Sequence, residues 1–143
     1  ETVRMLSERG VPVCAHLGLT PQSVNKFGGF RVQGRDEAGA EKILADAKLL
    51  ADAGADLLVL ECVPADLGAR ITREIAIPTI GIGAGRDTDA QVLVINDILG
   101  LTEQPPKFSK NFLLEATDIP GAMQKYVADV KAGTFPGDDN IFI

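Results

Sequence analysis

The feature that most constrains the fold is an apolar run that ends in an acid and is then broken by proline. It reads Leu57-Leu58-Val59-Leu60, followed by Glu61, Cys62, Val63 and Pro64. With Gly54 before it and Pro64 after it, the run predicts a strand of a parallel sheet that is buried on both faces. Glu61 stands at the carboxyl end of this strand, which is the edge where α/β folds bind their ligands. Glu61 is therefore a candidate acid or base.

The segments around this strand alternate between strand and helix patterns. We expect the end of a helix at 2–9, and further strands at 11–17, 77–82 and 92–95. Helical spacing predicts helices that follow Asp36, that begin at Asp66, and that cover 107–116 and 118–132. Only residues 86–91 separate the last two strands, so the helix between them must be very short or missing. Parallel strands with right-handed crossovers follow from this order.

The number of strands predicts an incomplete barrel. Four parallel strands with one ligand-binding edge are half of an eight-stranded (β/α)8 barrel, which takes about 250 residues. The chain has 143 residues, which we interpret as a single portion of one barrel domain, residues 1–143, with the other half absent from this chain. The alternative is a small, open, doubly wound sheet. That fold normally begins with a strand and a phosphate-binding turn, and this sequence does not.

The composition limits the classes of partner that the protein is expected to bind. A formal net charge of -6, with no Lys/Arg cluster, argues against a nucleic-acid surface and favours small-molecule partners. The apolar stretches are shorter than the roughly 18 residues needed to span a bilayer, so we expect no membrane segment and a cytoplasmic location. Cys14 and Cys62 form neither a disulfide framework nor a zinc set, and we interpret both as small buried hydrophobic residues.

Other positions carry weaker signals. His16, the only histidine, falls near the end of the first strand, and the long connection 19–34 is typical of a lid or binding loop. The turn 81–85 has three glycines, which either let a ligand approach the backbone or satisfy packing. Asp97 is expected to be a helix cap or a loop acid. The tail 134–143 is expected to dock on the body of the protein or on a neighbouring subunit.

Several motifs, taken in order, resemble one known family. They are Val-Pro-Val-Cys-Ala-His-Leu-Gly-Leu-Thr-Pro-Gln at 11–22, Val-Gln-Gly-Arg at 32–35, Leu-Val-Leu-Glu-Cys-Val-Pro at 58–64, Ile-Gly-Ile-Gly-Ala-Gly at 80–85 and Pro-Lys-Phe at 106–108. Together they closely resemble ketopantoate hydroxymethyltransferase over nearly the whole chain. The resemblance implies the C-terminal half of a TIM barrel, about four strands, followed by C-terminal helices.

The resemblance also implies a reaction. The family transfers a hydroxymethyl group from methylenetetrahydrofolate to 3-methyl-2-oxobutanoate, giving 2-dehydropantoate in pantothenate and coenzyme A biosynthesis. It implies Glu61 as the proton acceptor and His16 as a substrate-binding residue. It further implies Mg²⁺ held by the N-terminal half, so no metal ligand is expected here, and a homo-oligomer, a decamer by family resemblance. Proton removal beside a ketone needs a base, and burial should raise the pKa of Glu61 and strengthen it as one.

Simpler interpretations stay open. Glu61 could be a buried acid bonded to backbone amides, and His16 a core histidine bonded to a neighbouring loop. A second enzyme hypothesis is a magnesium-dependent keto-acid lyase of the phosphoenolpyruvate and isocitrate type, for which Arg86 is the obvious basic group. A third is an inactive half-barrel that serves assembly through residues 118–143.

Overall fold

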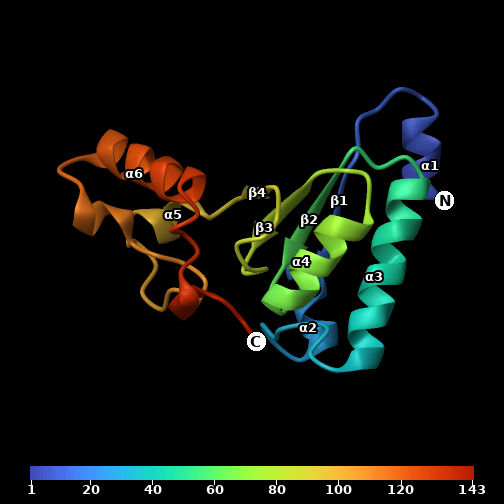
Figure 1. The fold of residues 1–143 in the computed structure, drawn as a ribbon, viewed down its shortest axis with the longest axis horizontal. Coiled ribbons are helices and arrows are strands. Elements are labelled where there is room, and N and C mark those ends of the chain that lie inside the picture. The colour runs from blue at the N-terminus through green and yellow to red at the C-terminus, as the bar shows by residue number, and fades with distance from the viewer.

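The computed structural model describes residues 1–143 and is built around a parallel sheet of four strands (Figure 1). The order across the sheet is β1-β2-β3-β4, which is also the order along the chain. The strands are β1 (Cys14–Gly18), β2 (Leu57–Glu61), β3 (Thr79–Ile82) and β4 (Ala90–Gln91). The predicted parallel α/β class is confirmed. The sheet is open, with β1 and β4 at its edges, so a closed barrel stays a prediction.

Two helices cover one face of the sheet (Figure 1). Helix α3 (Glu37–Asp52) connects β1 to β2, and helix α4 (Ala65–Glu74) connects β2 to β3. The predicted cap is confirmed, because the Asp36 side chain accepts a hydrogen bond from the Gly39 amide. No helix lies between β3 and β4, as the short spacing predicted. A short helix α1 (Thr2–Ser7) precedes the sheet.

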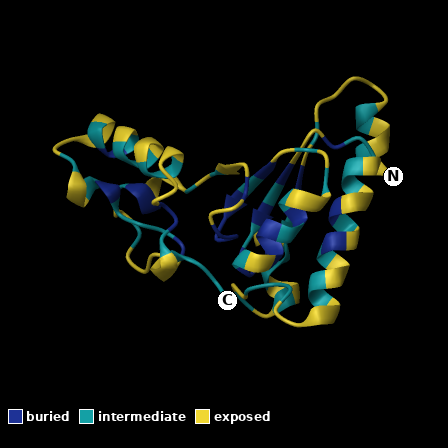
Figure 2. Ribbon diagram, viewed as in Figure 1, coloured by how far each residue is buried: buried dark blue, intermediate teal, exposed yellow.

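Alternation along the strands divides the sheet into a packed face and an open face. Leu58 and Leu60 of β2 are fully buried in the core formed with α3 and α4. The other face carries side chains that are exposed or half-buried, namely Cys14, His16, Leu57, Val59 and Ile80. Figure 2 shows the burial concentrated between the strands and the two helices. Since parallel sheets are normally covered on both faces, the open face is unusually bare for this fold class.

The C-terminal part forms a separate group of helices beyond β4 (Figure 1). It contains α5 (Ile95–Ile98), the 3₁₀ turn η2 (Phe112–Glu115) and α6 (Ile119–Lys131). Its core is aromatic: the Phe112 ring lies edge-on to Tyr126 and Phe135, with centroids 5.3 and 5.2 Å apart. The predicted helix at 118–132 is confirmed as α6, with Asp118 capping the Gly121 amide.

The predicted strand at 92–95 is wrong. Pairing with β3 covers only Ala90 and Gln91, and the ladder ends where the Val92 amide donates to the Gly81 carbonyl. The chain then leaves the sheet and begins α5 at Ile95. The apolar run has another cause, because the Leu93 side chain packs against two separate clusters, one at the sheet end and one in the C-terminal group.

The predicted helix at 107–116 is also wrong, apart from the short turn η2. The Ser109 hydroxyl and amide both bond to the Pro106 carbonyl, which makes a turn instead of a helix. The Asn140 side-chain amide donates hydrogen bonds to the carbonyls of Lys107 and Ser109 from a distant part of the chain. The local bonds of Ser109 and these long-range bonds occupy backbone groups that a helix would need.

The connection after β1 and the C-terminal tail each contain short helical turns. The connection after β1 contains η1 (Pro21–Ser23) and α2 (Val24–Phe27), and the tail contains η3 (Asp138–Asn140). The tail docks on the body, one of the two predicted outcomes: the Ala65 amide donates to the Phe142 carbonyl at 2.9 Å. No helix has the length and apolar character needed to cross a membrane.

Candidate active site

Glu61 is the last residue of β2, which lies between β1 and β3. It is in register with Gly18 of β1 and Ile82 of β3. Its side chain is 14% exposed. The Leu19 amide donates to the Glu61 carbonyl at 2.8 Å, which fixes the backbone on the β1 side. Burial raises the pKa of the Glu61 carboxyl above its ordinary value, because the charged form loses hydration. The structure therefore places Glu61 where the sequence predicted, in a setting that strengthens it as a base.

His16 lies on the neighbouring strand and points toward Glu61. It is in register with Val59, so its contact with Glu61 runs diagonally across the open face. His16 Nε2 and Glu61 Oε2 are 3.1 Å apart. The atoms are close enough for an ion pair, but they are not aligned as a hydrogen bond, and Nε2 is buried without a hydrogen-bond partner. The structure thus brings the two predicted site residues together and leaves one polar atom of the pair unused.

The protonation of this pair follows from its surroundings. Burial lowers the pKa of His16, since it penalises the imidazolium, while burial raises the pKa of Glu61. Both shifts favour the neutral form. A neutral imidazole gives Glu61 no counter-charge, and a carboxylate without one keeps its affinity for protons. The arrangement suits proton abstraction by Glu61.

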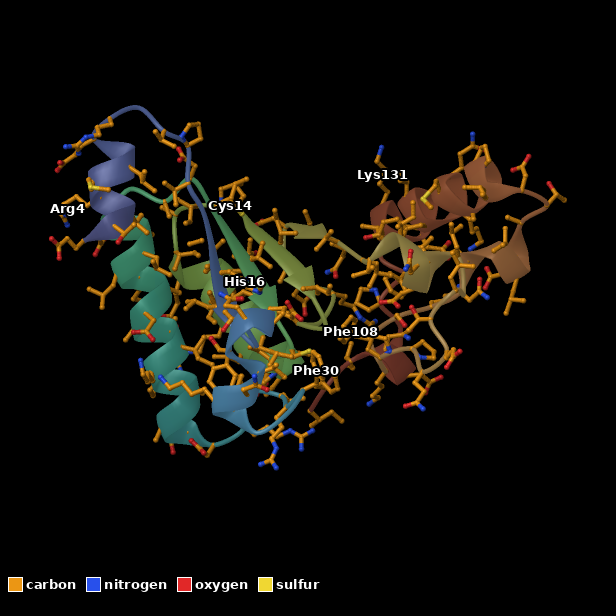
Figure 3. The ribbon with its side chains drawn as sticks, turned by 180° about the vertical axis from the view of Figure 1, so that it is seen from behind. Arg4, Cys14, His16, Phe30, Phe108 and Lys131 are labelled. Atoms are coloured by element: carbon orange, nitrogen blue, oxygen red, sulfur yellow. The ribbon has the colours of Figure 1, made fainter.

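A cavity of about 490 Å³ opens beside Glu61 at the carboxyl end of the strands. Three aromatic side chains line it, from the loop after β1, the segment after α5 and the tail: Phe30, Phe108 and Phe142. Its polar residues are Glu61, Asp97 and Lys107. Figure 3 places Phe30 and Phe108 close to the strand ends, below His16. The volume falls within the range of small-molecule sites.

Asp97 was not predicted to belong to this site, and its predicted role as a helix cap or loop acid is wrong. It lies within α5, which begins without a side-chain cap, and it is only 6% exposed. The Thr102 hydroxyl donates to Asp97 Oδ1 at 2.5 Å. No local pattern marks the residue, because its place in the cavity depends on how the segment after β4 folds back.

Cys62 turns the chain directly after Glu61. Its φ of 49° is a left-handed conformation that residues other than glycine rarely adopt. The Cys62 amide donates to the Ile82 carbonyl at 2.9 Å, and its carbonyl accepts from the Gln33 amide at 2.9 Å. Burial and the nearby Glu61 charge raise the pKa of the Cys62 thiol to about 12, so it stays protonated. Cys62 is buried as predicted, but Cys14 is exposed, which corrects its prediction as a buried residue.

The glycine turn after β3 serves packing. A β-carbon added at Gly83, where φ is 65°, would lie 2.7 Å from the Phe108 ring. Of residues 81–85, only Ile82 lines the cavity beside Glu61. The packing interpretation of this turn is therefore the one that the structure supports. The turn acts on the site indirectly, by letting Phe108 reach the cavity.

The residues of this chain do not form a metal centre. No group of three or more His, Cys, Asp or Glu side chains converges anywhere in residues 1–143. Glu61 and Asp97 line the same cavity, but no third ligand of these types joins them. A Mg²⁺ site built from this chain alone does not fit the side chains present.

Comparison with known proteins gives a consistent result. The family model described as ketopantoate hydroxymethyltransferase matches residues 1–138. A 3-methyl-2-oxobutanoate hydroxymethyltransferase of Saccharophagus degradans is 78% identical over 142 residues, which cover 99% of this chain and 53% of that protein. Proteins of the same name from Colwellia psychrerythraea and Cronobacter sakazakii are 61% and 59% identical, and the match covers 54% of each. The chain thus spans about half the length of these relatives, and it belongs to the ketopantoate hydroxymethyltransferase family.

Proposed function

We propose that the protein containing this chain transfers a hydroxymethyl group to 3-methyl-2-oxobutanoate. The donor we assign is 5,10-methylenetetrahydrofolate and the product is 2-dehydropantoate, in pantothenate and coenzyme A biosynthesis. The acceptor and the transferred group are those in the names of the relatives. The observation that carries the proposal is the pair formed by Glu61 and His16, with Nε2 and Oε2 3.1 Å apart. Glu61 lines the cavity, and His16 lies outside the lining.

Glu61 is the proposed base. It removes the proton from C3, the carbon next to the ketone of 3-methyl-2-oxobutanoate, and the electron pair of that C–H bond forms the enolate. The enolate carbon bonds to the methylene carbon of the donor in place of one of its two C–N bonds. The oxygen of one water replaces the other C–N bond and becomes the hydroxyl group. Tetrahydrofolate leaves with two new N–H protons, one from C3 and one from the water. The raised pKa of Glu61 supports the first step, because a base with a higher pKa takes the proton more readily.

His16 is the proposed substrate-binding residue. Its Nε2 is buried and has no hydrogen-bond partner within the chain. A buried polar nitrogen without a partner is costly, and a bound substrate oxygen or water at that position would satisfy it. The lowered pKa of His16 keeps the ring neutral, so we assign it to positioning of the keto acid and leave the proton transfer to Glu61.

The rest of the catalytic site is proposed to come from outside these residues. The sheet of this chain supplies four strands and one uncovered face, which suits half of a (β/α)8 barrel. We propose that the N-terminal half of the same barrel covers that face and supplies the Mg²⁺ ligands, because the side chains here do not form a metal site. A cytoplasmic homo-oligomer is also a proposal, and it rests on the family alone.

The lyase alternative gains no support. Arg86, the basic group that it would need, pairs with Asp138 on the surface and does not line the cavity. A second phosphate or carboxylate on the substrate would therefore meet no free guanidinium there. The cavity's one cation is Lys107, whose ammonium donates to the Ile141 carbonyl at 2.7 Å.

A chimera tests the proposal. This chain would replace the matching stretch of the Saccharophagus degradans relative, and the purified chimera would be incubated with 3-methyl-2-oxobutanoate, 5,10-methylenetetrahydrofolate and Mg²⁺. We expect 2-dehydropantoate, detected by mass spectrometry. Deuterium exchange at C3 of the keto acid should fall by roughly a hundredfold or more in Glu61→Gln.

The matched control is Glu103→Gln, which changes an exposed glutamate that does not line the cavity. Its exchange rate should equal that of the unsubstituted chimera. A folded chimera that forms no product would contradict the proposed function and would favour an inactive assembly role for this half. Unchanged exchange in Glu61→Gln would contradict the role of Glu61 alone.

A further inference from the structure

The cavity beside Glu61 has a second carboxyl side chain, Asp97, that the proposed proton transfer does not use. Asp97 is 6% exposed, and its Oδ1 accepts the Thr102 hydroxyl at 2.5 Å. Its Oδ2 accepts no hydrogen bond from the chain, and it is not one of the buried polar atoms that lack a partner, so it is open to the cavity. A carboxylate oxygen that is open to a cavity can accept a hydrogen bond from a bound partner.

The walls around Asp97 restrict the shape of that partner. Phe30, Phe108 and Phe142 line the same cavity, together with aliphatic and proline side chains. Phe30 is 81% exposed, which is unusual for a phenylalanine, and it lies near the strand ends with Phe108 (Figure 3). Aromatic faces that line a cavity of about 490 Å³ favour a flat ring that can stack on them.

The carboxylate of Asp97 restricts the chemistry of the ligand that can bind there. A carboxylate has only acceptor oxygens, so its partner must donate, and two parallel N–H groups fit its two oxygens best. A 2-amino-4-oxopyrimidine ring presents such a pair, its amino group and the neighbouring ring N–H. Each Asp97 oxygen can accept more than one hydrogen bond, so Oδ1 can keep Thr102 and still take part.

We propose that Asp97 binds the pyrimidine edge of the reduced pterin of the one-carbon donor. The inference rests on the proposed function and adds the donor subsite to it: Phe30 stacks on the ring while Asp97 accepts from its N–H groups. Glu61 lines the same cavity, so the donor's methylene carbon is delivered to the side of the cavity where the enolate forms. Asp97 thereby determines specificity for the donor and takes no part in removing the C3 proton.

Substitution of Asp97 in the chimera tests this assignment. Asp97→Asn keeps the shape and an oxygen for Thr102, but it puts an N–H₂ group where the ligand needs an acceptor. We expect the KM for 5,10-methylenetetrahydrofolate to rise by roughly tenfold or more, and the affinity for tetrahydrofolate, measured by anaerobic calorimetry, to fall equally. Deuterium exchange of the keto acid without any folate should stay within about twofold, because removal of the C3 proton does not use the donor subsite.

Two further variants separate binding from folding. Phe30→Ala removes an exposed ring, so it should leave the fold intact, and we expect it to weaken tetrahydrofolate binding several-fold. Thr102→Val removes the hydroxyl that contacts Asp97 but keeps the carboxyl group, and we expect a smaller effect than in Asp97→Asn. If Thr102→Val has the full effect, Asp97 only supports the local structure and the inference is wrong.

The readouts also separate this inference from the proposed function. Normal tetrahydrofolate affinity in both Asp97→Asn and Phe30→Ala, in an active chimera, would overturn the donor subsite and leave the function standing. A chimera that makes no product but binds tetrahydrofolate in an Asp97-dependent way would support the subsite and contradict the overall reaction. Equal losses of keto-acid exchange and donor affinity in Asp97→Asn would overturn the subsite.

Discussion

Gly18 and Glu61 approach each other so closely that no other residue fits at position 18. A β-carbon added to Gly18 would lie 2.1 Å from the Glu61 carbonyl oxygen, and the φ of Gly18 is 86°. The same carbonyl accepts the Leu19 amide at 2.8 Å. The end of β1 therefore sets the position of the Glu61 backbone, and with it the position of the proposed base.

Gly18→Ala should destabilise the protein and reduce activity. The substitution combines a left-handed backbone with a clash against a backbone atom that cannot move freely, so we expect a loss of roughly 2 kcal/mol or more in the free energy of unfolding. The matched control is Gly10→Ala, where φ is 73° but nothing lies within 4 Å of the added carbon. Denaturant unfolding of the two chimera variants measures the difference. Equal losses would show that the contact with Glu61 has no cost.

The buried carboxyl group of Glu61 should make stability depend on pH. Burial raises its folded-state pKa, so as the pH rises above about 4.5 the unfolded chain loses this proton first, and ionisation then favours unfolding. Glu61→Gln removes that cost. We expect the variant to have a higher Tm than the unsubstituted chimera at about pH 8, with the gap closing near pH 4. A gap that is the same at both pH values would contradict a raised pKa.

His16→Asn should weaken keto-acid binding more than it slows turnover. Asn shortens the side chain and removes the Nε2 atom that lies 3.1 Å from Glu61 Oε2, while Glu61 remains in place as the proposed base. We expect the KM for 3-methyl-2-oxobutanoate to rise by about tenfold, with a smaller fall in kcat. Cys14→Ser, on the same face but in register with Leu57 and without a contact to Glu61, is the control and should change neither value. A collapse of kcat with KM unchanged would assign proton transfer to His16.

The two cysteines report on what covers the open face. Cys14 is exposed on that face, whereas Cys62 is buried with its thiol pKa raised to about 12. In the isolated chain, a thiol reagent should label Cys14 quickly and Cys62 slowly, as followed by mass spectrometry. In the chimera, Cys14 should become protected, because the other half of the barrel would cover it. Rapid labelling of Cys14 in the folded chimera would contradict the half-barrel arrangement.

The central part of the fold could be predicted because local signals and tertiary packing agree there. The run ending at Glu61 is apolar, bounded and paired on both sides, and β2 lies where its pattern predicts. Asp36 and Asp118 cap the predicted helices, since an acid before a helical repeat acts through the nearest amides alone. The position of His16 beside Glu61 follows from parallel pairing of two predicted strands.

The region after β3 could not be predicted, because its conformation depends on distant contacts. The apolar residues at 92–95 follow a strand pattern. Leu93 instead packs against two hydrophobic clusters that the sequence does not reveal. Carbonyls at 107 and 109 bond to Asn140, more than thirty positions away. Asp97 lines the cavity only because the segment after β4 folds back toward the sheet. No local sequence pattern therefore indicates that this second carboxyl group belongs to the site.

The isolated 143-residue chain should bind Mg²⁺ weakly and without help from the keto acid. Mg²⁺ keeps near-octahedral geometry and several waters, and its sites are usually completed by carboxylates or substrate oxygens that converge on it. Glu61 and Asp97 line one cavity here, but no group of three potential ligands forms. Calorimetric titration with Mg²⁺, with and without 3-methyl-2-oxobutanoate, should therefore give no keto-acid-dependent binding, while the chimera titrated in the same way should give it. Circular dichroism of the isolated chain, together with slow labelling of Cys62, checks that the chain is folded during the titration. Tight keto-acid-dependent binding to this chain alone would place the metal beside Glu61 and would remove Glu61 as the free base.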